Sequence, residues 1–151
     1  MTPRGRLLGV DYGSVRVGLA ISDADRIIAS PLATYERYDA DRDAAFFRGM
    51  IQKESAVGMI VGLPVHLDGR EGVKAVEARQ YGAWLQHVSG LPIVFADERF
   101  TTVDAESALW NAGLTHKKRK GRRDRVAAQI MLQAYLDAGC PGEVEVRALD
   151  E

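Results

Sequence analysis

Cysteine is almost absent from this sequence of 151 residues, where Cys140 is the only one. One cysteine excludes an internal disulfide and any thiolate metal cluster built from a single chain, and it fits a reducing compartment. The sequence also lacks a run of about eighteen uncharged apolar residues, the length that crosses a bilayer. Its first residues show no apolar signal-peptide core. We therefore expect a cytoplasmic protein.

Several motifs that mark common enzyme classes are also missing. There is no Gly-x-Ser-x-Gly motif, no P-loop and no Rossmann glycine fingerprint, which counts against hydrolase triads, nucleotide switches and dinucleotide cofactors. The three histidines, His66, His87 and His116, have no metal-ligand spacing. Aromatic residues make up only 7% of the chain, and Tyr12 is a weak candidate for stacking on a base.

What the sequence does have is enough apolar residues for one core. Hydrophobic residues make up 46% of the chain, and its length is common for one domain. We expect a single domain over residues 1–139 and an acidic tail over residues 140–151. The formal net charge is -1, so attraction for nucleic acid must come from charge gathered in one place. Residues 117–125 hold a large share of the positive charge.

Hydrophobic periodicity predicts strands first, and then alternating helices and strands. Residues 6–12 and 15–22 indicate a β-hairpin, and residues 26–37 indicate a third strand, which Pro31 places at a sheet edge or a bulge. Two apolar runs indicate buried strands, and four segments have helical patterns. These strands are expected at 58–64 and 92–96, and the helices from residue 41 and over 70–88, 101–111 and 123–138.

This order of elements predicts an α/β fold. Three antiparallel strands followed by parallel strands form a mixed five-stranded sheet, and helices cover both of its faces. The helical patterns also predict which residues face the core. Val73 and Val76 are expected to do so from the second helix, and Ala127 and Ala134 from the last.

Two candidate catalytic carboxylates follow apolar strands. Asp11 ends the first strand, and Gly13 after it would let a phosphate or hydrated metal approach the backbone. Glu98 follows the last apolar strand, where open α/β sheets place ligand sites. Its neighbour Asp97 is a second candidate, but successive strand residues point to opposite faces, so we prefer Glu98. Taken alone, Asp11 is more simply a turn residue, because Asp-x-Gly is common at hairpins.

A third carboxylate, Asp124, opens the last helix. Helical spacing aligns it with Ala127, Ala128 and Met131, so burying those residues brings it toward the strand ends. Three carboxylates form an oxygen-rich site that suits Mg²⁺ or Mn²⁺. Two such ions can activate a water and stabilise the departing oxygen in phosphodiester cleavage. The alternative is a helix cap or a charge partner for neighbouring arginines.

Basic residues surround the proposed Asp124 ligand. Such charge runs are usually solvated loops, but here the positive charge would lie where a phosphate backbone must pass. Glycines bracket the segment, and we expect it to be a mobile loop. The predicted nucleic-acid contacts are Arg16, Arg99, Lys117, Lys118, Arg119, Lys120, Arg122 and Arg123.

Four separated strings resemble one family. GVDYGSVRVGLAISD, IVGLPVHLDG, DERFTT and GRRDRVAAQIMLQAYL, in this order and spacing, resemble the YqgF/RuvX family of Holliday junction resolvase-like proteins and pre-16S ribosomal RNA nucleases. The match covers about residues 7–136. The resemblance implies a ribonuclease H-like fold, a carboxylate triad at Asp11, Glu98 and Asp124, and maturation of the 5′ end of the small-subunit ribosomal RNA precursor. A departure is the arginine pair before Asp124, where lysine is frequent.

Competing functions follow from the same residues. The leading hypothesis is a metal-dependent endonuclease acting on pre-16S ribosomal RNA, and its rival is a Holliday junction resolvase acting on branched DNA, because the triad reads phosphates and not sugars. The related fold of sugar kinases and chaperone ATPases needs two lobes, and the chain has one. A binding module without catalysis is a fourth reading. The oligomeric state stays open, and a homodimer is one candidate because ribonuclease H-like resolvases often pair.

Overall fold

A computed structural model describes residues 5–66, 68–98 and 116–142, with only the backbone described for 116–121. The predicted tail beyond residue 142 and the helix expected at 101–111 lie outside the described residues.

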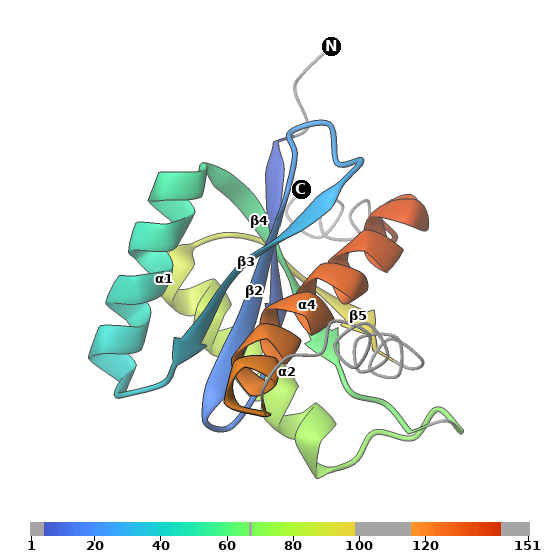
Figure 1. Ribbon diagram of the computed structural model, residues 1–151. Helices are drawn as coiled ribbons and strands as arrows, with labels where there is room; N and C mark the ends of the chain where they lie inside the picture. The colour runs from blue at the N-terminus through green and yellow to red at the C-terminus, as the bar shows by residue number, and fades with distance from the viewer. Residues whose placement is uncertain (1–4, 67, 99–115, 143–151) are drawn as a thin grey trace.

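A mixed five-stranded sheet forms the centre of the molecule (Figure 1). Its strands lie in the order β3-β2-β1-β4-β5. The strands β1, β2 and β3 form an antiparallel meander, whereas β4 and β5 run parallel to β1. Their bounds are β1 Arg6–Asp11, β2 Arg16–Ser22, β3 Ala29–Glu36, β4 Ala56–Leu63 and β5 Ile93–Asp97. The predicted mixed sheet is confirmed.

Helices cover both faces of the sheet, as the sequence predicts (Figure 1). Helices α1 (Ala40–Glu54) and α2 (Val73–Ser89) cover one face, where Phe47 and Leu85 are fully buried. Helix α4 (His116–Asp137) crosses the other face over β1, β2 and β3, and Leu132 is fully buried there. Among the described residues, no helix combines the length and apolar character needed to cross a bilayer.

Strand β3 lies at the edge of the sheet and carries Pro31. The ladder between β2 and β3 shifts register between Leu19 and Ala20, next to this proline. A proline cannot donate a backbone hydrogen bond, so an edge position with a bulge accommodates it. The sequence predicts this placement correctly.

The inward faces of α2 and α4 differ from the prediction. Val73 and Val76 are 76% and 51% exposed, whereas Ala75 and Ala78 are fully buried. In α4 the predicted core residue Ala134 is exposed. Close packing of a helix on a sheet selects small residues at the contact, and hydrophobicity alone does not identify them.

Helix α4 begins earlier than the sequence analysis predicts. Its first residue is His116, so the segment 117–123 is helical backbone and not a loop. Lysine and arginine have high helix propensity, and one glycine costs only about 1 kcal/mol in a helix. Asp124 therefore lies inside the helix and does not open it.

Candidate active site

The ends of two strands bring Asp11 and Glu98 together. Asp11 is the last residue of β1, and Glu98 directly follows β5. Because both strands run parallel to β4, their carboxyl ends meet at one edge of the sheet. The Glu98 amide donates to the Leu63 carbonyl at 3.1 Å, and the Glu98 side chain shares a hydrogen bond with Asp11. The neighbouring Asp97 is exposed.

Two glycines make room for this arrangement. A Cβ built on Gly62 of β4 would overlap the Glu98 carboxylate, so the missing side chain lets that carboxylate lie over the strand. A Cβ on Gly18 of β2 would overlap the carbonyl of Asp124. Gly18 is also the register partner of Asp11. Each proposed acid therefore depends on a glycine or a strand end for its position.

Burial controls the protonation of the Asp11 and Glu98 pair. Desolvation raises the pKa of Asp11, and the nearby Asp124 raises it further, while the hydrogen bond from Glu98 and the charge of Arg123 oppose this. Desolvation, the hydrogen bond to Asp11 and the charges of Asp11 and Asp97 raise the pKa of Glu98 to about 10. At neutral pH without a cation, Glu98 therefore stays protonated, and its carboxyl group donates a hydrogen bond to the Asp11 carboxylate.

Asp124 reaches the same region from α4 but has a different partner. Its Oδ2 atom lies 3.1 Å from Nε of Arg16, and the two side chains are 20% and 23% exposed. A cavity of about 440 Å³ is lined by Asp124, Glu98 and Arg16. Within the described parts of the chain, however, no three acidic, histidine or cysteine side chains are close enough to hold one metal ion. The structure thus joins two of the three predicted acids and pairs the third with an arginine.

The cavity also contains residues that the sequence analysis did not single out. Lys74, in the first turn of α2, and Glu77, one turn later, both line it. Tyr12, the weak stacking candidate of the sequence, lines it too, and its hydroxyl donates to Glu77 at 3.2 Å. A lysine in the first turn of a helix that follows a buried strand is a signal that could have identified Lys74.

The predicted basic contacts fall into three groups. Arg16 lines the cavity, and Arg123 is close enough to Asp11 to lower its pKa. Arg122, beside it, is exposed. Arg99 lies outside the described residues, as do the side chains of Lys117, Lys118, Arg119 and Lys120.

Known proteins resemble the chain in sequence and in fold. A protein of Rhodopirellula baltica named "Putative pre-16S rRNA nuclease" is 46% identical over 134 residues, which are 89% of this chain and 78% of that protein. A protein of the same name from Rhodobacter capsulatus is 41% identical over 133 residues, which are 88% of this chain and 84% of that one.

Two solved resolvases have the same fold at low sequence identity. Thermus thermophilus RuvC in complex with a Holliday junction substrate aligns with a TM-score of 0.56 and 15% identity over 90% of this chain and 97% of that one. The Fowlpox virus resolvase bound to junction DNA aligns with a TM-score of 0.54 and 10% identity over 88% and 97%. These alignments confirm the ribonuclease H-like fold. The model of the family described as "RuvX: Holliday junction resolvase" matches residues 5–138, and the chain belongs to this family.

Proposed function

We propose that this protein is a divalent-metal-dependent endonuclease that processes the 5′ end of pre-16S ribosomal RNA, with Asp11, Glu98 and Asp124 as its catalytic carboxylates. Membership of the RuvX family and the names of its relatives support phosphodiester hydrolysis and this substrate. The observation that carries the metal dependence is the hydrogen-bonded, half-buried pair of Asp11 and Glu98.

Two carboxyl groups in contact and largely out of water are unfavourable for folding unless something compensates their charge. A proton on Glu98 does so in the absence of a cation. Carboxylate oxygens are also the ligands that Mg²⁺ and Mn²⁺ prefer, so the donor set fits a hard divalent ion. Asp11 and Glu98 would hold it, with Glu98 giving up its proton. The expected second ion stays a prediction.

The ion pair between Asp124 and Arg16 gives each partner a second role. When Asp124 turns toward Asp11 and Glu98, the Arg16 guanidinium becomes available to a phosphate in the same cavity. Lys74 of α2 adds positive charge to the lining of the same cavity. The divalent cation that Asp11 and Glu98 would hold would supply activation of a water and stabilisation of the departing oxygen. Arg16 and Lys74 orient the scissile phosphate in the cavity.

A junction resolvase acting on branched DNA is the second candidate. The description of the family and the fold shared with two junction-bound resolvases favour it. The carboxylates contact phosphates in either substrate, so contacts to the 2′-hydroxyl decide between RNA and DNA.

Parallel incubation with two substrates tests both functions. Purified protein with Mn²⁺ or Mg²⁺ is given a pre-16S 5′ leader or a four-way DNA junction, and Asp11→Asn is the inactive control. We expect cleavage of the leader that requires the metal and is lost in Asp11→Asn and Asp124→Asn. Cleavage of the junction alone would favour the resolvase, and undiminished cutting by Asp124→Asn would remove that residue from the mechanism.

A further inference from the structure

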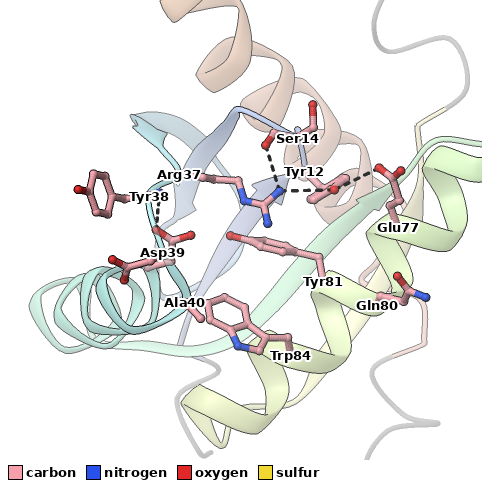
Figure 2. Close-up of a pocket in the computed structure, with 11 residues that line it drawn as sticks. Tyr12, Ser14, Arg37, Tyr38, Asp39, Ala40, Glu77, Gln80, Tyr81 and Trp84 are labelled. Atoms are coloured by element: carbon pink, nitrogen blue, oxygen red, sulfur yellow. Dashed lines mark hydrogen bonds between the residues drawn. The ribbon is translucent and has the colours of Figure 1, made fainter.

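A second cavity lies beside the proposed cleavage site. Its volume is about 480 Å³, which falls in the range of about 300–1,000 Å³ typical of small-ligand pockets. Tyr12, Ser14 and Glu77 line both cavities, so the two share a wall. Figure 2 shows its walls coming from the β1–β2 turn, the segment after β3, and α2. We call this cavity the aromatic pocket.

Aromatic rings form much of the wall of the aromatic pocket. The rings of Tyr12 and Tyr81 have centroids 5.0 Å apart, and those of Tyr81 and Trp84 are 5.4 Å apart. Tyr38 is also among the lining residues and is 71% exposed. Proteins that bind single-stranded nucleic acid stack unpaired bases on such side chains, because every base has a π-face.

Arg37 is fixed in the wall. Its guanidinium carbon lies 5.3 Å from the centre of the Tyr12 ring and 4.9 Å from that of Tyr81. One terminal nitrogen donates to the carbonyl of Ser14 at 3.3 Å (Figure 2) and to that of Gly13 at 3.2 Å. These bonds hold Arg37 against the β1–β2 turn. Its buried Nε has no hydrogen-bond partner among the described residues, and so remains a donor for a ligand.

Tyr81 offers a second free polar group. Its side chain reaches from α2 into the aromatic pocket and is 6% exposed (Figure 2). Its hydroxyl is buried and has no partner in the part of the chain that the structure describes. Buried polar groups are nearly always paired, so an unpaired hydroxyl lining a cavity indicates a ligand that pairs with it.

The charge of the aromatic pocket discriminates against phosphate. Asp39, Asp43 and Glu77 line it and outnumber the single cation Arg37. A phosphate placed there would face three carboxylates, whereas a neutral base with exocyclic amino groups would not be repelled.

We propose that the aromatic pocket receives an unpaired nucleobase of the substrate, stacked on Trp84 and hydrogen-bonded by the Tyr81 hydroxyl and Arg37 Nε. This inference rests on the proposed function, because a strand in the cleavage cavity places the neighbouring nucleotide at the shared wall. The phosphates stay beside Arg16 and Lys74, and one base turns past Tyr12 into the pocket.

Binding without cleavage tests the pocket separately from catalysis. The Asp11→Asn protein in Mg²⁺ is titrated against a mixed-sequence single-stranded DNA of ten nucleotides and against its abasic analogue, with fluorescence anisotropy as the readout. The abasic strand keeps every phosphate, so it reports only backbone contacts. We expect the strand with bases to bind at least about fivefold more tightly, the effect of one stacked base.

Two substitutions locate the effect. Trp84→Leu removes the π-face and keeps an apolar side chain, and Tyr81→Phe removes only the unpaired hydroxyl. Both should lower affinity for the strand with bases and leave the abasic strand unchanged. The matched control is His87→Leu, an exposed position on the same helix that does not line the pocket.

The outcomes separate the two proposals. Equal affinity of the Asp11→Asn protein for both strands would overturn the base pocket and leave the nuclease proposal standing. The base pocket would also be overturned if the Trp84 and Tyr81 variants lost the same affinity for both strands. Failure to bind either strand would overturn the base pocket, while cleavage of the 5′ leader decides the nuclease proposal independently.

Discussion

The Glu98→Gln substitution should stabilise the metal-free protein and change how its stability depends on pH. In the fold the pKa of Glu98 is about 10, against an ordinary value of 4.5. Between these values the unfolded chain has lost the proton and the folded chain keeps it. The contribution of Glu98 to stability is therefore greatest below pH 4.5 and falls as the pH rises toward 10.

The size of the effect follows from the shift. Each pKa unit corresponds to about 1.4 kcal/mol, so Glu98 costs at most about 3 kcal/mol of folding free energy at pH 7. From pH 5 to pH 8 the loss is at most about 4 kcal/mol. A glutamine has no charge to desolvate, and its amide can donate to Asp11 as the protonated acid does. The variant should therefore lack this pH dependence.

Urea unfolding in EDTA, monitored by circular dichroism at pH 5 and at pH 8, measures the difference. The control is Glu36→Gln, the same substitution at an exposed residue that ends β3. Adding Mg²⁺ at pH 8 should recover stability in the wild type and not in Glu98→Gln, because only the carboxylate holds the ion. If the free energy of unfolding changed equally between pH 5 and pH 8 in the wild type and in Glu98→Gln, Glu98 would not be protonated in the fold.

Gly18→Ala should destabilise the fold by roughly 1–3 kcal/mol and reduce cleavage, because the new Cβ overlaps the α4 backbone. Gly49→Ala is the control in the same thermal melt, and it should not destabilise the fold because its Cβ meets open space. Neutralising residues 117–120 should weaken nucleic-acid binding and lower the slope of log affinity against log salt, by about 0.9 per lost phosphate contact on duplex DNA; an unchanged slope would exclude that contact. Tyr35→Phe should cost about 1 kcal/mol in urea unfolding because it removes a 2.7 Å hydrogen bond. Tyr81→Phe removes an unpaired hydroxyl and should not lower the free energy of unfolding. If Tyr35→Phe and Tyr81→Phe lost the same stability, the Tyr81 hydroxyl would not be unpaired.

The sequence alone determined the sheet and the places of two acids. Alternating and continuous apolar runs are local signals, and they predicted the antiparallel hairpin, the parallel strands and the edge position of Pro31. Asp11 and Glu98 could be located because strand ends converge in an open α/β sheet. Their contact follows from strand order, which the pattern of elements restricts.

Only the tertiary structure decided which groups touch. The pairing of Asp124 with Arg16, at 3.1 Å, joins side chains 108 residues apart. It also decided that alanines and not valines of α2 face the sheet. The aromatic pocket combines Tyr12, Arg37 and Trp84, which are separated in the sequence and share no motif. Periodicity reports which residues are buried along one element, whereas contacts between elements depend on close packing of particular shapes, which no local pattern encodes.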